Sequence, residues 1–402
     1  WLLGSPGDGP AALGYTAPVM IILARPSVSP YLSKTLFELG EPAILAEDIK
    51  VPMKPALRLE PAQVIVDRPK QAYQSLILTS SENALAFLQE AIPHDDRVLK
   101  ARLFKDKVAF RRSLAKLYPE FYFKETTVSE LPKLDAATLR FPLVIKPAAG
   151  ISSIGVRRVE RAADWKDAIG FLTHDLATYA ANYAGIVVDA QKVILEEWIP
   201  GIELAVDCYF DGKAEPVILN VMEHMFKDAA DTSDLVYYTR RSLVRRHYQA
   251  IHEFLVRLGD LFDLKRFPMH LELRLTPHGQ LLPIEVNPLR FAGLGTTEIA
   301  EYAYAINVYK HFFRETRPDW DAILDEPDDS VYTFLCTDVP TEKYGSGVRI
   351  DDRALWKSFG EVLEYRMLDE DETSTFAVIF LRADDLEENR RLLGTDLTRF
   401  MQ

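Results

Sequence analysis

The chain has 402 residues, of which 48% are hydrophobic, so it is expected to fold into two to four subdomains and not into one core. Its net charge of −13, from 47 basic and 60 acidic residues, argues against a general nucleic-acid binder, which needs a basic surface. Cys208 and Cys336 form no metal-binding spacing and no disulfide framework, as expected in a reducing cytoplasm. No apolar run approaches the ~18–20 residues that span a membrane, so no membrane partner is expected.

The first part of the chain alternates strand and helix patterns. Apolar strands are predicted at 19–24, 43–46 and 76–79. A helix is predicted between Ser29-Pro30 and Gly40, and another through residues 84–91. Alternation of this kind indicates a mostly parallel sheet, so residues 19–105 are expected to form an N-terminal α/β domain.

The middle of the chain is predicted to contain two further subdomains. Residues 106–200 read as a small lid, with a helix over 104–118 that carries Lys107, strands at 143–146, 156–159 and 193–197, and a helix near 162–173. Residues 201–318 read as a larger sheet domain, with strands at 203–209 and 217–222, a charged loop over 223–246, a helix ending near 262 and a helix over 298–313.

The last part of the chain is predicted to be a separate appendage. Residues 318–330 are acidic and contain proline, which is typical of a linker. A strand over 331–339, a helix within 354–365 and a strand over 376–381 then suggest a small β-α-β unit, so that 319–402 forms a C-terminal domain.

The most informative motif is the pair of runs His270–Arg274 and Ile284–Pro288, separated by a turn-rich stretch with Pro277 and Gly279. This pattern predicts a β-hairpin. Because side chains alternate along a strand, His270, Glu272 and Arg274 share one face. Glu285 and Asn287 share a face of the partner strand, and such oxygen ligands suit Mg²⁺. The structural alternative is a solvated sheet face with ordinary cross-strand pairs.

Two further motifs precede the hairpin. The strand ending in Lys146 is followed by a loop of small residues that contains Ser152, Ser153 and Gly155, and such loops let backbone N–H groups approach phosphate. The strand 193–197 runs into Trp198, Ile199 and a Pro-Gly turn, with Glu203 just beyond it. Backbone groups beside an apolar surface can bind adenine, and a carboxylate can bind ribose hydroxyls.

In this order, the motifs resemble those of the ATP-grasp superfamily, over roughly residues 100–310. The resemblance implies an ATP-grasp fold with an N-terminal parallel α/β domain, a small lid and a larger catalytic sheet domain. It also implies roles for individual residues. Lys107 and Lys146 would bind phosphate under the loop that holds Ser152, Ser153 and Gly155. The stretch of Glu196, Glu197, Trp198 and Ile199 would contact adenine, Glu203 would bind ribose, and Glu272, Glu285 and Asn287 would bind metal.

One position departs from the family pattern. Many carboxylate–amine ligases of the superfamily have an arginine two residues after the metal-binding asparagine, where this chain has Leu289. The role is carried to Arg290, with Arg274 as a second candidate for stabilising the transferring group.

Four residues are candidates for binding substrate. His270 shares a face with Glu272, and His224 precedes an acidic loop. Arg240 and Arg241 could grip a carboxylate, although a solvated charge-rich loop is the alternative interpretation.

The resemblance therefore implies an ATP-dependent, ADP-forming ligase that joins a carboxylic acid to an amine through an acylphosphate. Its cofactors would be ATP and Mg²⁺, with Mn²⁺ as an alternative, and its partners two small molecules, with a homodimer as one option. A carboxylase-like enzyme acting through carboxyphosphate and a non-catalytic nucleotide-binding regulator are alternatives.

Overall fold

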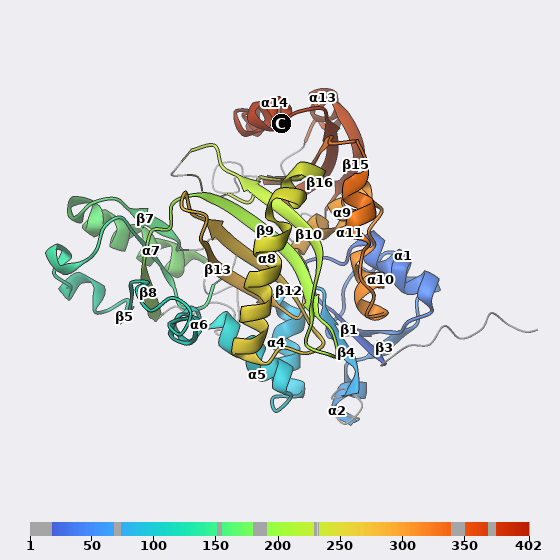
Figure 1. Cartoon of the computed structure of the whole chain (residues 1–402), viewed down its shortest axis with the longest axis horizontal. Helices are drawn as coiled ribbons and strands as arrows, with labels where there is room; N and C mark the ends of the chain where they lie inside the picture. The colour runs from blue at the N-terminus through green and yellow to red at the C-terminus, as the bar shows by residue number, and fades with distance from the viewer. Residues whose placement is uncertain are drawn as a thin grey trace, which may run out of the picture.

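Three β-sheets organise the described part of the protein. The computed structural model describes residues 18–67, 74–150, 155–179, 191–228, 231, 233–338, 350–368 and 375–401. Two sheets have four strands and one has eight. Figure 1 shows the lid, which holds β5 and β8, on one side of the large sheet and the N-terminal sheet on the other.

The N-terminal sheet is parallel, in the order β3-β2-β1-β4. Its strands are β1 (Val19–Leu23), β2 (Ala43–Leu45), β3 (Leu59–Pro61) and β4 (Leu76–Thr79), and its helices are α1 (Pro30–Leu39), α2 (Gln63–Asp67) and α4 (Glu82–Ala91). The Ser29 side chain caps α1, and Gly40 ends it in the left-handed region at φ 67°. The predicted parallel α/β domain is confirmed.

The lid sheet is antiparallel, in the order β5-β8-β6-β7. It consists of β5 (Phe123–Thr127), β8 (Lys192–Glu197), β6 (Leu143–Pro147) and β7 (Arg157–Val159). Helix α7 (Trp165–Tyr179) packs on it through Leu172 and Leu176, which belong to a small core of the lid's own. Short 3-10 turns join these elements: η2 (Leu131–Lys133), η3 (Ala136–Thr138) and η4 (Ala162–Asp164).

The predicted single helix over 104–118 is wrong. The chain forms α5 (Asp96–Lys105) and α6 (Lys107–Leu114), which meet at Asp106. The backbone of Asp106 is extended, and its carboxylate accepts hydrogen bonds from the N–H groups of Val108 and Ala109 at 3.0 Å each. Asp106 therefore ends one helix and caps the next.

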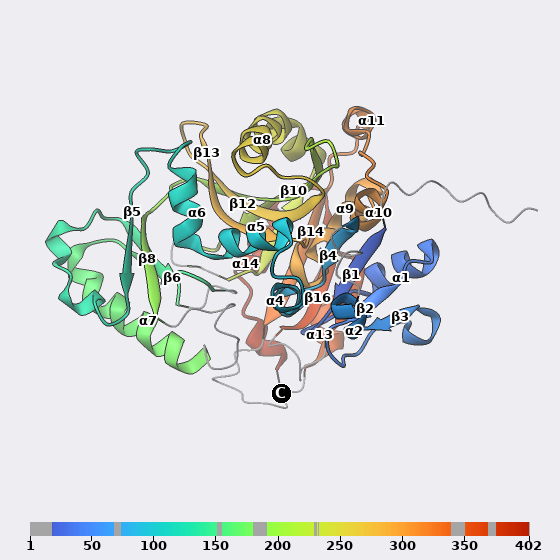
Figure 2. The ribbon, with the colours of Figure 1, turned by 90° about the horizontal axis from the view of Figure 1, so that it is seen from below.

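The eight-stranded sheet has the order β13-β12-β9-β10-β11-β14-β16-β15. Its first five strands are β9 (Ile202–Phe210), β10 (Pro216–Met225), β11 (Val236–Thr239), β12 (Phe267–Leu275) and β13 (Leu281–Pro288). Helix α8 (Arg241–Phe262) covers one face, where Gly259 lies against Phe210. Figure 2 shows α8 on one side of this sheet and the N-terminal elements on the other. Strand β11 and the start of α8 lie within 223–246, so that range is not the single loop that was predicted.

The C-terminal residues extend this sheet and do not form the predicted β-α-β appendage. Strands β14 (Val331–Asp338), β15 (Glu361–Met367) and β16 (Thr375–Ala383) are antiparallel, and β14 pairs with β11. A parallel β-α-β unit was expected because a helix pattern separates the strands. Helix α13 (Asp352–Lys357) is only six residues long, and residues predicted as helix form β15 instead.

Two smaller expectations also differ from the structure. The range 298–313 forms two helices, α9 (Ile299–Tyr304) and α10 (Val308–Phe313), which are separated at Ala305 with φ 54°. The predicted linker contains α11 (Trp320–Asp325). The remaining elements are α14 (Glu387–Leu393), η1 (Lys54–Ala56), η6 (Gly293–Glu298) and η7 (Leu397–Phe400). Within the described ranges, no helix combines the length and apolar character needed to cross a bilayer.

Candidate active site

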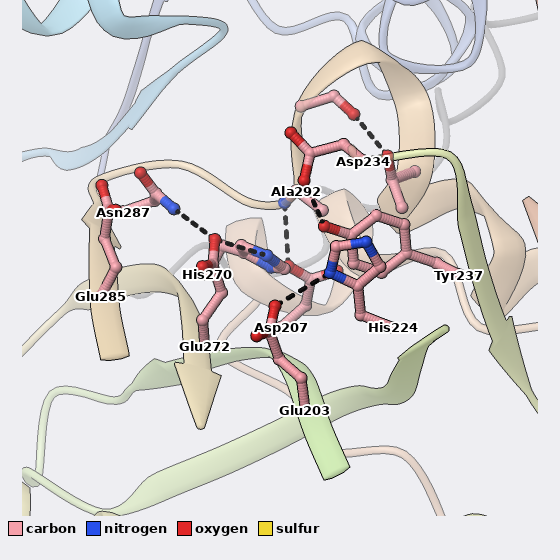
Figure 3. A network of polar contacts seen from close by, with 12 residues as sticks. Glu203, Asp207, His224, Asp234, Tyr237, His270, Glu272, Glu285, Asn287 and Ala292 are labelled. Carbon is pink, nitrogen blue, oxygen red and sulfur yellow. Dashed lines mark hydrogen bonds and ion pairs between the residues drawn. The ribbon is translucent and has the colours of Figure 1, made fainter. Parts of the chain in front are cut away.

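The predicted hairpin is present as β12 and β13. Its turn closes with a hydrogen bond from the N–H of Thr276 to the carbonyl of Gln280. The register places Glu272 opposite Glu285 and His270 opposite Asn287. The four predicted side chains therefore gather on one face of two neighbouring strands, as Figure 3 shows.

The two opposed carboxylates have different electrostatic environments. Burial and the neighbouring charge of Glu285 raise the pKa of Glu272 to about 7. Burial also acts to raise the pKa of Glu285, but Lys107 and Lys105 outweigh it and lower that pKa to about 2. Directly opposed like charges are unfavourable, and the pair relieves this repulsion by letting one carboxylate hold a proton.

This pair of strands offers a donor set that fits a hard cation. Among the described residues, no group of three His, Cys, Asp or Glu side chains is arranged to hold a metal. The predicted set consists of two carboxylates and the amide of Asn287, whose Nδ2 donates to Glu272 Oε1 at 3.3 Å. Carboxylate and amide oxygens suit Mg²⁺, which completes its shell with water and phosphate oxygens.

A cavity of about 520 Å³ lies beside this hairpin, and its walls come from the lid and from the large sheet. The lid and its hinge contribute Lys146, Glu196, Glu197, Trp198 and Ile199. The large sheet contributes Glu203, His224, Glu272, Arg274 and Glu285, and Lys107 joins them from the start of α6. The structure thus brings together most of the residues that were predicted from sequence.

Lys146 is held in the cavity wall by a buried ion pair. Its Nζ lies 2.6 Å from Glu196 Oε2, and Glu196 Oε1 lies 2.6 Å from Nε of Arg111. Burial acts to raise the pKa of Glu196, but the two cations lower it to about 2. Glu196 was predicted to belong to the adenine-contacting hinge. Its side-chain oxygens bind Lys146 and Arg111, so any contact of Glu196 with adenine would come from its backbone.

Lys107 lies between the lid and the hairpin. Its Nζ is 3.3 Å from the carbonyl of Gly150 and 3.3 Å from Glu285 Oε2. The predicted loop residues Ser152 and Ser153 lie outside the described residues. Gly155 is described: its N–H donates to Asp175 Oδ2 at 3.2 Å, and its φ of 68° favours glycine. A Cβ there would also lie 2.9 Å from Leu172 Cδ1.

Glu203 forms a buried cluster with His224 and Arg274. Glu203 Oε1 lies 2.9 Å from His224 Nδ1, and Oε2 lies 2.9 Å from Arg274 NH2. His224 Nε2 lies 2.9 Å from the carbonyl of Ser233, and its ring stacks on Tyr237 (Figure 3). The Arg274 guanidinium lies over the ring of Trp198, 5.1 Å from the centroid. Both carboxylate oxygens of the predicted ribose ligand are thus engaged within the protein.

His270 is oriented by the carboxylate of Asp207, which is not among the predicted site residues. His270 Nδ1 lies 2.9 Å from Oδ1 of Asp207, a fully buried residue of β9, and the N–H of Ala292 donates to the same oxygen at 2.9 Å. His270 Nε2 lies 3.9 Å from Glu272 Oε1. Asp207 thus connects the hairpin to the turn that follows it, as Figure 3 shows.

Three predicted arginines lie elsewhere. Arg290 binds Glu82 Oε1 through NH2 at 2.9 Å and does not line the cavity. Arg240 forms an ion pair with Asp329, and Arg241 donates to the carbonyls of Ile323 and Asp328. These contacts hold the start of α8 against the segment before β14. The donors of Arg240 and Arg241 thus bind other parts of the protein, and neither residue lines the cavity.

Several residues of the site were missed. Lys105, Arg111 and Asp234 are not among the predicted site residues, because the predicted helix and loop give them no special position. Asp234 lines the cavity and accepts a hydrogen bond from the Tyr237 hydroxyl at 2.9 Å. For Lys105 the signal was present in the sequence, since Lys105-Asp106-Lys107 places a helix-capping residue between two lysines.

Comparisons with known proteins agree with this geometry. The profile of the ATP-grasp domain family matches residues 139–298, from just before the lid strand β6 to the end of η6. The D-alanine–D-alanine ligase of Aquifex aeolicus is 24% identical over 181 residues, which cover 44% of this chain and 54% of that protein. The D-alanine–D-alanine ligase of Mannheimia succiniciproducens is 32% identical over 104 residues, or 25% of this chain and 29% of that protein. The chain thus spans about half or less of these relatives.

A solved structure resembles the chain over almost its whole length. The L-amino acid ligase from Bacillus licheniformis superimposes with a TM-score of 0.65 and 19% identity, covering 96% of this chain and 98% of that one. At this identity the likeness establishes the fold.

Proposed function

Because the chain belongs to the ATP-grasp superfamily, we propose that it is an ATP-dependent ligase that joins a small carboxylic acid to an amine and releases ADP and phosphate. The relatives described above are named as ligases of amino acids, so an amino acid is the first candidate for the acid. The two D-alanine–D-alanine ligases match only part of the chain, and the L-amino acid ligase is only 19% identical, so the activity rests on the geometry of the site.

The observation that carries the proposal is the set of charges that line the cavity. Lys107 and Lys146 line it together with the carboxylates Glu272 and Glu285, and Lys107 Nζ lies 3.3 Å from Glu285 Oε2. A nucleotide triphosphate with a divalent cation matches this set, because the lysines neutralise phosphate oxygens and the carboxylates bind the cation. Positioning and charge neutralisation are the main tasks of a protein in phosphoryl transfer.

Glu272, Glu285 and Asn287 would hold Mg²⁺ or Mn²⁺. When bound, the metal supplies neutralisation of charge on the phosphates during transfer. The side chains around it supply orientation: Glu196 fixes Lys146, and Asp207 fixes His270 beside Glu272. Arg274 also lines the cavity, and its guanidinium forms an ion pair with Glu203.

In the proposed reaction, a carboxylate oxygen of the acid bonds to the γ-phosphorus and the bond to the β-phosphate oxygen breaks, which releases ADP. The amine nitrogen then bonds to the acyl carbon, the acyl–phosphate bond breaks, and the amine loses a proton. The protein needs no nucleophile of its own for either step.

Release of ADP and phosphate with pairs of amino acids and small acids tests this proposal. We expect both products to appear in equal amounts only when an acid and an amine are present together with Mg-ATP. Lys146→Met should reduce turnover at least ~100-fold, because a charge that contacts the transferring group is lost. The exposed Lys116→Met is the matched control and should leave turnover unchanged. Bicarbonate-dependent release without an added acid would favour a carboxylase instead.

A further inference from the structure

Lys105, the last residue of α5, contacts two of the three predicted metal ligands. Its Nζ lies 3.4 Å from Glu285 Oε1 and 3.4 Å from Asn287 Oδ1. A third oxygen, Glu82 Oε2, lies 3.2 Å away. The residue is only 5% exposed. An ammonium group has three N–H donors, and here three acceptors surround it, so Lys105 is fully satisfied where it lies.

The break between α5 and α6 makes this contact compatible with that of Lys107. Neighbours two positions apart on a continuous helix point in very different directions. Because Asp106 interrupts the helix, both ammonium groups reach Glu285, Lys105 at Oε1 and Lys107 at Oε2. Each oxygen of this carboxylate therefore already has one cationic partner.

The two lysines differ in their access to the cavity. Lys107 lines it and also contacts the carbonyl of Gly150 in the lid. Lys105 is not among the lining residues, and its ammonium group is held beside Glu285 and Asn287 by Glu82. Glu82 is in turn bound by Arg290 at 2.9 Å. A nucleotide in the cavity can draw Lys107 toward its phosphates, whereas Lys105 has no comparable partner to move to.

We propose that Lys105 is a fixed internal cation that occupies one side of Glu285 and Asn287, and that the site therefore binds a single divalent cation, on the cavity side of Glu272, Glu285 and Asn287. The inference rests on the proposed function, since it assumes that nucleotide and divalent cation bind here. Lys105 is a positioning residue in this account, because it acts on the cation through the ligands and touches no substrate.

The test is a count of Mn²⁺ ions per bound nucleotide. The full-length protein is dialysed to equilibrium against Mn²⁺ and a non-hydrolysable ATP analogue, free Mn²⁺ is measured from its electron paramagnetic resonance signal, and bound analogue is measured by absorbance. We expect one Mn²⁺ per bound analogue in the unmodified protein. In Lys105→Met, which keeps the length of the side chain, we expect a second Mn²⁺ to bind, because Glu285 Oε1 and Asn287 Oδ1 become free.

Lys100→Met is the matched control, since Lys100 lies on the same helix and contacts Asp96 and Asp263 away from the hairpin. It should still give one Mn²⁺. If Lys105→Met does not fold, the double variant Lys105→Met with Glu82→Gln removes the anchoring charge as well and takes its place.

The possible results separate the two proposals. Two Mn²⁺ ions per analogue in the unmodified protein, or a count of one in the folded Lys105 variant, would overturn the role of Lys105 and leave the ligase proposal standing. Absence of any nucleotide-dependent Mn²⁺ binding in the unmodified protein would overturn both.

Discussion

At the scale of single residues, the pairing of Glu272 with Glu285 is the central feature of the site. Both side chains are predicted metal ligands, and the register of β12 and β13 sets them directly opposite each other. Lys105 and Lys107 compensate Glu285, whereas burial and Glu285 itself disfavour a second charge on Glu272. The negative charge on Glu272 that the proposed metal site needs therefore lowers the stability of the metal-free protein.

We predict that Glu272→Gln makes the metal-free protein more stable and the enzyme much less active. The substitution removes repulsion, so the melting temperature should rise. It also removes a metal ligand, so turnover should fall ~100-fold or more. Calorimetry and ADP release on one preparation check both effects. If Glu272 had only a structural role, stability and activity would fall together.

The stability of the metal-free protein should also depend on pH through Glu272. Its pKa is raised to about 7 in the folded protein from an ordinary value of 4.5. Between these two values the folded state holds a proton that the unfolded state releases. The stability that Glu272 contributes through this proton is fully present below pH 4.5 and is lost as pH rises through 7. We therefore expect the free energy of unfolding to fall across this window. Denaturant titrations at several pH values measure it, and Glu272→Gln should have a flatter profile than the unmodified protein.

At the scale of secondary-structure elements, the break between helices α5 and α6 positions two lysines of the site. The end of α5 and the start of α6 place Lys105 and Lys107 on the same carboxylate. The hydrophobic spacing over 104–118 could not show this break, because apolar residues continue at helical intervals across it. Asp106 is a residue type that often caps helices, but this residue type also occurs at exposed positions inside helices.

We predict that Asp106→Ala costs about 1 kcal/mol of stability, the usual value for a lost helix cap, and raises the KM for ATP. The KM effect follows because α6 begins with Lys107. Asp135→Ala removes the cap of the 3-10 turn η3 in the lid and serves as a control, since Asp135 accepts from the Ala137 N–H and does not line the cavity. An unchanged KM in the Asp106 variant would show that the cap does not position Lys107.

The hairpin and the lid strands were predictable because their patterns are local. The alternation over 270–274 and 284–288 and the turn between them specify the pairing almost completely. The roles of Arg240, Arg241 and Arg290 were not predictable, because their partners Asp329, Asp328 and Glu82 lie between 87 and 208 positions away. Sequence patterns show which side chains can bind a charge, and the tertiary structure decides which charge they bind.

At the scale of the whole molecule, the C-terminal strands belong to the same sheet as the candidate active site. Strand β14 pairs with β11, and Arg366 of β15 binds Glu298 Oε2 at 2.7 Å, just beyond the hairpin. Glu298 also accepts a hydrogen bond from Ser29 of the N-terminal domain. Three distant parts of the chain therefore meet at one buried carboxylate. The prediction of a separate appendage failed because local patterns do not reveal which sheet a strand joins.

We predict that Arg366→Met destabilises the entire protein by about 3–5 kcal/mol, since it leaves the buried Glu298 without its cationic partner. Arg382→Met is the control from the neighbouring strand. Arg382 pairs with Glu361 at the surface, and its loss should cost much less stability than the loss of Arg366. Equal, small losses in the two variants would indicate that the C-terminal strands are energetically independent of the site.

The most direct test of the account is the fate of carboxylate oxygen during ligation. An acid that supports turnover is labelled with ¹⁸O in its carboxylate, and the products are analysed by mass spectrometry. If the carboxylate attacks the γ-phosphorus to form an acylphosphate, one labelled oxygen should appear in the released phosphate and none in ADP. Phosphate free of label, formed at the same rate as ligated product, would contradict the proposed reaction.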